Sequence, residues 1–204
     1  MFFYRGLRKI YRILNVFVAT LYAKFILSLY RVKYGKNLVC RGLAIIDIHP
    51  TGVLQIGDNF KMNSGNNFNR IGRQQKSILL AGINSALHIG NNVKISSTAI
   101  IAYNKISIGN NVVIGGNTVI YDSDFHSLNH NDRAEKEFDW TKNVVSTSKP
   151  VVIADNVFIG AHSTILKGVT IGENSIIAAC SVITKNIGAG ELWGGNPARL
   201  IRKV

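Results

Sequence analysis

Residues 151–186 read VVIADNVFIGAHSTILKGVTIGENSIIAACSVITKN. Isoleucine recurs at every sixth position of this segment, from Ile153 to Ile183. A period of six matches neither the 3.6-residue repeat of a helix nor the two-residue alternation of a strand. It is typical of a solenoid in which short strands alternate with tight turns, so that three strands form one coil.

The same frame recurs earlier in the chain, and turn-forming pairs separate many of the repeats. Isoleucine at six successive repeat positions argues against the alternative, an ordinary β-sandwich in which the spacing is a coincidence. We therefore predict an all-β solenoid with stacked isoleucines in its core. Further core positions are predicted at Ile89, Ile95, Ile101, Ile108, Ile114 and Ile120. The predicted corner pairs are Asp58-Asn59, Asn91-Asn92, Asn110-Asn111, Asp155-Asn156 and Glu173-Asn174.

Three segments depart from the repeat, which we place at residues 35–187. Residues 127–149 are polar and charged, contain Trp140, and are predicted to form an excursion loop with a functional role. Residues 61–83 are only loosely periodic and indicate irregular coils or a short loop. Residues 188–204 are turn-rich and then basic, which predicts a C-terminal cap and tail.

Residues 1–34 combine apolar positions at helical spacing with a basic cluster. The cluster begins at Arg5, and no acidic residue precedes Asp47. We predict a helical extension that lies at a membrane interface, with its cations toward anionic head groups. Two alternatives stay open: a helix packed on the solenoid or on a sister subunit, and a true span, for which Lys24 would be costly.

The bulk composition limits the class of protein. The chain has 204 residues, of which 47% are hydrophobic and 17% charged, so a packed domain is expected rather than disorder. The formal net charge of +13 is concentrated near the two ends, and we expect no nucleic-acid partner. Two cysteines and no signal-type cleavage site predict a cytoplasmic protein, peripheral at the inner face of the cytoplasmic membrane.

His126 is the candidate catalytic residue because it lies where the repeat breaks, in YDSDFHS. An imidazole can accept a proton near neutral pH. If the strand continues, Asp124 has the same side-chain parity and can orient the ring. The alternative is that this segment is only the polar entrance to a loop.

The hexapeptides, the DSDFHSL segment, the long loop and the C-terminal GGNPARLIRKV together resemble the left-handed β-helix O-acetyltransferases. The resemblance is to the galactoside and maltose acetyltransferases and to the acetyltransferases of capsule, lipopolysaccharide and exopolysaccharide pathways. The resemblance covers roughly residues 85–204. It does not include the N-terminal helix.

This resemblance implies a left-handed parallel β-helix that assembles as a homotrimer, with active sites in the grooves between subunits. It implies acetyl-CoA as the donor, no metal, and direct transfer to a hydroxyl of a sugar or glycan in cell-surface polysaccharide biosynthesis. His126 falls on the family's general base, and a backbone N–H would stabilise the oxyanion. No acyl-enzyme would form.

The resemblance also implies binding residues. The family often has an asparagine near the reacting centre, where this chain has Ser96 or Ser97, and we expect Ser96, Trp140 and His130 on the acceptor side. Basic side chains would bind the coenzyme's phosphates, although a solvated tail is the alternative. The implied coenzyme-binding residues are Phe158, Ala161, His162, Ala179, Thr184, Lys185, Arg199 and Arg202.

Other functions stay open. An N-acetyltransferase that acts on an amino sugar is the nearest alternative. A γ-carbonic-anhydrase-like metalloenzyme shares the solenoid and would need a metal held by three histidines, for which His126, His130 and His162 are the candidates. A catalytically silent scaffold at the membrane is a third class, and an intact His126 argues against it.

Overall fold

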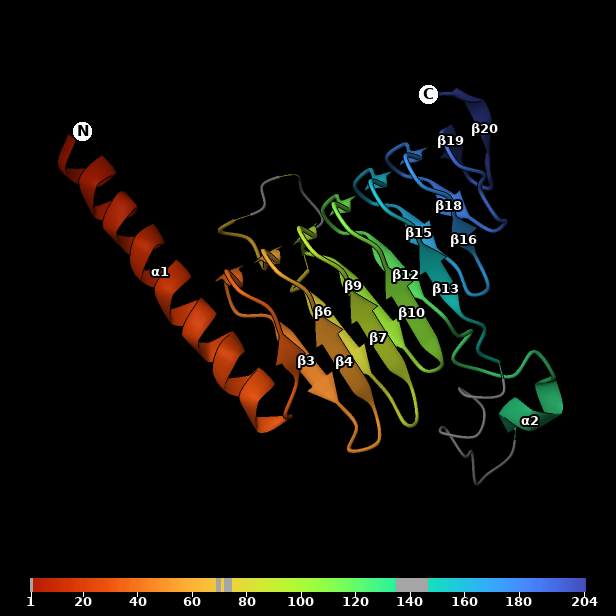
Figure 1. Cartoon of the computed structure of the whole chain (residues 1–204), viewed down its shortest axis with the longest axis horizontal. Coiled ribbons are helices and arrows are strands. Elements are labelled where there is room, and N and C mark those ends of the chain that lie inside the picture. The colour runs from red at the N-terminus through yellow and green to blue at the C-terminus, as the bar shows by residue number, and fades with distance from the viewer. Residues whose placement is uncertain (1, 69–70, 72–74, 135–146) are drawn as a thin grey trace.

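The computed structural model of the chain describes residues 2–68, 71, 75–134 and 147–204. A long helix, α1 (Phe2–Leu29), lies at one end of a three-sided solenoid, and a β-hairpin lies at the other end (Figure 1). Each turn of the chain contributes one strand to each of three sheets, which we name A, B and C. The predicted parallel solenoid is therefore confirmed.

The strands are parallel throughout the three sheets, except for the terminal hairpin. Sheet A contains β1 (Lys33–Tyr34), β4 (Val53–Ile56), β7 (Ala86–Ile89), β10 (Lys105–Ile108), β13 (Val151–Ile153) and β16 (Thr170–Ile171). Sheet B contains β2 (Val39–Arg41), β5 (Lys61–Asn63), β8 (Lys94–Ser96), β11 (Val113–Ile114), β14 (Phe158–Ile159), β17 (Ile176–Ile177), β19 (Glu191–Gly195) and β20 (Ala198–Lys203). Sheet C contains β3 (Ile45–Ile48), β6 (Ile78–Ala81), β9 (Ala99–Ala102), β12 (Val119–Tyr121), β15 (Thr164–Ile165) and β18 (Val182–Ile183).

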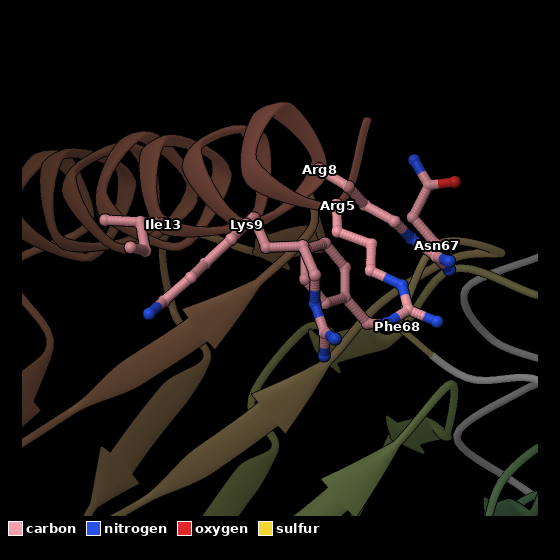
Figure 2. A pocket seen from close by; sticks show the side chains of 7 residues that line it. Arg5, Arg8, Lys9, Ile13, Asn67 and Phe68 are labelled. Atoms are coloured by element: carbon pink, nitrogen blue, oxygen red, sulfur yellow. The ribbon is translucent and has the colours of Figure 1, made fainter. Parts of the chain in front are cut away.

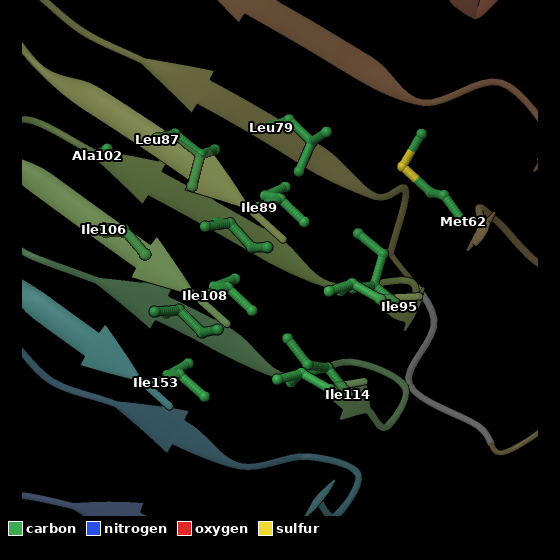
Figure 3. Close-up of a cluster of buried hydrophobic side chains, with 14 of the residues drawn as sticks. Met62, Leu79, Leu87, Ile89, Ile95, Ala102, Ile106, Ile108, Ile114 and Ile153 are labelled. Atoms are coloured by element: carbon green, nitrogen blue, oxygen red, sulfur yellow. The ribbon is translucent and has the colours of Figure 1, made fainter. Parts of the chain in front are cut away.

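The core is the predicted ladder of isoleucines. The six isoleucines of the opening segment are each 1% exposed or less, and earlier coils continue the column (Figure 3). The expectation for Ile101 was wrong: Ile100 is 0% exposed and pairs with Ile120, whereas Ile101 faces outward beside Tyr121. The corner that follows β8 is one residue shorter than its counterpart after β11, which shifts the frame by one.

An asparagine ladder holds the corners between sheets A and B. Each of these asparagines has a φ between 57° and 60°, a left-handed conformation that asparagine tolerates better than most residues. Their side-chain amides form hydrogen bonds from coil to coil at 2.8–3.1 Å. The members are Asn37, Asn59, Asn92, Asn111, Asn156 and Asn174.

Gly160 lies in close contact with the backbone of the next coil. A Cβ on this residue would lie 2.4 Å from the backbone nitrogen of Ala179. We expect Gly160→Ala to lower the free energy of unfolding by about 1–3 kcal/mol, because backbone must move to admit the methyl group. Thermal unfolding measures this. Gly6→Ala is the control, since nothing lies within 4 Å of its Cβ position, and equal destabilisation by both changes would contradict the argument.

Helix α1 packs one face against the first coil. Ala19, Ala23 and Leu27 are buried against the solenoid. The Thr20 hydroxyl donates to the carbonyl of Cys40 at 3.1 Å and accepts from its N–H at 3.0 Å. Burial raises the pKa of the Cys40 thiol to about 12, so this thiol is protonated at neutral pH. Packing on the solenoid thus applies to one face of the helix.

The opposite face of α1 is apolar and exposed. By length and composition alone, Tyr4–Leu29 is apolar enough to cross a membrane, and most of this segment is not buried in the chain. A surface of this size without cover is unusual for a soluble monomer and points to a partner or a lipid phase. The exposed apolar side chains of α1 include Leu7, Ile10, Leu14, Phe17, Val18, Leu21, Phe25 and Leu29.

Two loops leave the solenoid, and a hairpin follows it. The first loop joins β5 to β6 at the corner between sheets B and C, within the loosely periodic region. The second leaves after β12, carries the short helix α2 (His130–Ala134), and returns to β13 at the corner between sheets C and A. The hairpin β19–β20 extends sheet B.

Candidate active site

The backbone turns sharply just before His126, where the chain leaves β12. Phe125 has a φ of 65°, and its N–H donates to the Ser123 hydroxyl at 3.0 Å. The Phe125 ring packs edge-on against Tyr121 and Tyr103, with centroids 5.1 and 6.0 Å away. His126 follows this anchored residue directly and is exposed. The aromatic contacts therefore fix the point from which the candidate base extends.

Asp122 supports the same corner from inside the solenoid, a role that the sequence analysis missed. Its side chain is 0% exposed, and its two carboxylate oxygens accept from the N–H groups of Tyr103 and Asn104, each at 2.8 Å. Burial raises the pKa of the Asp122 carboxyl, and the backbone hydrogen bonds oppose this rise. The available signal was an acidic residue directly after a strand, at a corner position.

An ion pair lies where the excursion loop leaves the solenoid and returns to it. Asp124 pairs with Lys167, whose ammonium also donates to the carbonyl of Thr147 at 2.8 Å. The Lys149 N–H donates to the carbonyl of Asp122 at 2.7 Å. The structure thus gives the Asp124 carboxylate to Lys167, and the orientation of His126 by Asp124 stays a prediction.

The start of the excursion is locally ordered by hydrogen bonds. The Ser127 hydroxyl donates to Asp132 at 2.6 Å, and Arg133 donates to the carbonyl of Ser127 at 2.6 Å. His130 begins α2 and is exposed. Trp140, predicted to contact the acceptor, lies outside the described residues.

Three of the predicted coenzyme-binding residues meet at the corner between sheets B and C. Ala161 and Ala179 occupy equivalent positions of successive coils next to Gly160. His162, with a φ of 61°, lies 3.4 Å through Nδ1 from the side-chain nitrogen of Asn117. The two alanines place small side chains at this corner. Their contact with the coenzyme stays a prediction.

The other predicted binding residues lie elsewhere on the solenoid. Phe158 is 46% exposed on the outer face of sheet B. Thr184 and Lys185 follow β18, at the opposite edge of sheet C and on the same corner as Lys167. The Ser96 hydroxyl accepts from Asn63 at 2.9 Å, two coils before Ala161. The exposed Arg199 and Arg202 lie on β20.

Chemically, the arrangement supplies an exposed imidazole at the corner between sheets C and A, whereas the small residues Ala161 and Ala179 lie at the other edge of sheet C. Within the described ranges, no three His, Cys, Asp or Glu side chains gather as a metal site would require. The exposed imidazole suits proton transfer.

Comparisons with known proteins agree with this architecture. Residues 150–185 match the family model described as bacterial transferase hexapeptide (six repeats). AntD, an N-acyltransferase from Bacillus cereus solved with dTDP and 3-hydroxybutyryl-CoA, superposes with a TM-score of 0.66 and 23% identity, over 88% of this chain and 87% of AntD. A search of curated proteins found no match.

Two further solved structures are acetyltransferases. A hexapeptide-repeat acetyltransferase from Vibrio cholerae O1 biovar eltor, complexed with acetyl coenzyme A, has a TM-score of 0.51 and 27% identity, over 86% of this chain and 74% of its own. A galactoside acetyltransferase in complex with coenzyme A has a TM-score of 0.52 and 25% identity, over 86% and 68%. Residues 150–185 therefore match the bacterial transferase hexapeptide, and the chain has the left-handed β-helix fold of the hexapeptide-repeat acetyltransferases to which it is similar.

Proposed function

We propose that this protein transfers an acetyl group from acetyl-CoA directly to a hydroxyl of a sugar or glycan in cell-surface polysaccharide biosynthesis. The observation that carries the proposal is the position of His126, exposed on an anchored turn directly before coils that match the transferase family model. The two acetyltransferases of similar fold, solved with acetyl coenzyme A or coenzyme A, support the donor.

The mechanism needs one base and no covalent enzyme intermediate. Neutral His126 accepts the proton of the acceptor hydroxyl while the hydroxyl oxygen attacks the thioester carbonyl carbon. Attack forms the C–O bond and gives a tetrahedral intermediate. The C–S bond of this intermediate then breaks, and the imidazolium returns the proton to the leaving thiolate of coenzyme A. Phe125 and Asp122 act as positioning residues, because they hold the turn that precedes the base.

The residues present fit an extended coenzyme. Ala161 and Ala179 leave room at the corner between sheets B and C where larger side chains would project. Arg199 and Arg202 supply guanidinium groups at the end of sheet B, and guanidinium suits the geometry of phosphate. This assignment explains the basic tail, which a solvated terminus would not require.

Replacing both tail arginines with glutamine is expected to raise the KM for acetyl-CoA about 10-fold, which corresponds to one charge-assisted hydrogen bond, while kcat stays within about twofold. Steady-state kinetics with varied acetyl-CoA measures the change. Lys203→Gln removes a neighbouring exposed charge and is the control. An unchanged KM in the Arg199→Gln/Arg202→Gln variant would instead support a solvated tail.

A homotrimer and a membrane-proximal location complete the proposal. The outer face of sheet C carries apolar side chains on successive strands, among them Ile78, Leu80, Ile101 and Val119, which supports self-association over this face. The exposed apolar face of α1 supports attachment at the inner face of the cytoplasmic membrane. Sedimentation of the purified protein tests the trimer.

An acceptor screen with labelled acetyl-CoA tests the proposed chemistry. The panel contains sugars, glycans, sugar nucleotides and amino sugars, and we expect label in a product that hydroxylamine cleaves, as it cleaves esters. A labelled product that resists hydroxylamine would be an amide and would replace the proposal with N-acetylation of an amino sugar. If no member of the panel receives label, both O-acetylation and N-acetylation of these acceptors are contradicted.

A further inference from the structure

A basic hollow lies between the N-terminal half of α1 and the loop that follows β5. It encloses about 710 Å³, and the hydroxyl of Tyr11 accepts a hydrogen bond from Asn67 at 3.2 Å, which ties the loop to the helix. Figure 2 shows the Arg5 and Arg8 side chains extending from the helix toward the loop residues Asn67 and Phe68. The lining residues are Arg5, Arg8, Lys9, Arg12, Ile13, Asn67 and Phe68.

The arginines of this hollow belong to the same helix stripe that docks on the solenoid. Positions 5, 8, 12, 16, 19, 23 and 27 follow one another at the i+3 and i+4 spacing of a helix face. The last three of these positions are alanine or leucine buried against the first coil. The first three are arginines, which lie beyond that packed region and face the loop instead. The helix therefore presents cations where its packing partner ends.

Within the described ranges, the four cations of the hollow have no acidic partner at ion-pair distance. Four like charges at one hollow repel one another, and an anion bound among them would remove this cost. Guanidinium groups bind phosphate through paired hydrogen bonds. Phe68 and Ile13 add apolar surface beside the charges. The chemistry thus favours a phosphate group that carries an apolar part.

We propose that this hollow binds the phosphate headgroup of an anionic membrane lipid. The exposed apolar face of α1, which includes Leu14, Val18 and Leu21, lies on the opposite side of the helix from the arginine stripe. A helix that lies in the interface buries its apolar face at the boundary of headgroups and acyl chains, and the basic residues of its polar face attract anionic headgroups. The site rests on the proposed attachment of α1 to a membrane, but not on the chemistry proposed for His126.

Vesicle flotation of the full-length protein tests the site. One set of vesicles contains phosphatidylcholine alone, and the other contains equal parts of phosphatidylcholine and phosphatidylglycerol. We expect binding to the anionic vesicles. The affinity of Arg5→Gln/Arg8→Gln/Arg12→Gln should be weaker by about 100-fold or more, since each of the three basic residues near such a surface contributes about fivefold and direct contacts in the hollow add to this loss. These side chains are exposed, so the variant keeps its packed core.

A charge-matched control separates a site from general attraction. Lys33→Gln/Lys36→Gln/Lys61→Gln removes three exposed charges outside the hollow, and we expect it to retain most of the binding. Equal loss in the two triple variants would overturn the site, as would equal binding to both kinds of vesicle. Attachment that survives an alkaline high-salt wash would show a span and overturn the interfacial arrangement.

Inorganic phosphate is the second probe. A thermal shift with phosphate that the arginine triple variant abolishes, without vesicle binding, would assign the hollow to a soluble anion and overturn the lipid proposal. Acetyl transfer to a soluble acceptor is measured in the same preparations. We expect it to be unchanged in both triple variants, so loss of lipid binding and failure of the proposed activity are read separately.

Discussion

His126→Ala is expected to reduce acetyl transfer by about 10²–10⁴-fold, the usual contribution of a positioned general base. The side chain is exposed, so its truncation leaves the core intact. Because the imidazole acts on the acceptor proton, the affinity for acetyl-CoA should stay nearly unchanged. Kinetics with a saturating acceptor and calorimetric titration with acetyl-CoA measure the two quantities.

His88→Ala is the matched control. It removes the same atoms as His126→Ala, but from sheet A rather than from the corner after β12. We expect it to keep wild-type transfer. Full activity in His126→Ala would remove this residue from the mechanism. A parallel loss of acetyl-CoA binding would instead assign the imidazole to donor recognition.

Asp122→Ala is expected to lower the free energy of unfolding by about 2–4 kcal/mol. The carboxylate accepts from two backbone N–H groups, and hydrogen bonds to a charged group contribute about 1.5–3 kcal/mol each, less here because Asn104 is exposed to water. For a chain of this size the melting temperature should fall by roughly 4–16 °C. Transfer should fall as well, because the Asp122 carboxylate holds the backbone of the neighbouring coil at the corner from which His126 extends.

Asp122→Asn distinguishes the capping role from a role in proton transfer. The amide keeps one acceptor oxygen in the same shape, so it should restore about half of the lost stability and most of the activity. A stable but inactive Asp122→Asn would indicate that the charge takes part in the reaction. Unchanged unfolding of Asp122→Ala would show that water replaces the carboxylate at this corner.

Much of the solenoid could be predicted because one inward residue recurs at every face. The failure at Ile101 has a simple physical cause. Two isoleucines are adjacent there, and a corner shortened by one residue decides which of them enters the core. The six-residue period alone does not reveal that a corner is one residue shorter when the two candidate core residues are both isoleucine. The single unpartnered buried hydroxyl of the described residues, Ser97 Oγ, lies at this same corner.

The candidate site could be predicted less completely, because its contacts join distant parts of the chain. Lys167 follows Asp124 by 43 positions, and nothing local in the sequence pairs them. The buried role of Asp122 was equally hidden, since acidic residues at turns are usually solvated. The place of His126 at the end of the repeat could be predicted, because the break in the repeat is visible in the sequence, while its catalytic role stays a prediction. The partners that hold it required the three-dimensional arrangement.

Helix α1 also covers one open end of the solenoid. Every coil of a solenoid offers the next one open backbone groups, and an uncovered terminal coil would accept a coil of another molecule and begin a fibre. Helix α1 packs against β2 and β3 at the first coil, while β20 ends sheet B antiparallel, with a register shift and exposed arginines. The two ends are thus closed by different means, and the helix that we propose to meet the lipid also covers the end on which a coil of another molecule could stack.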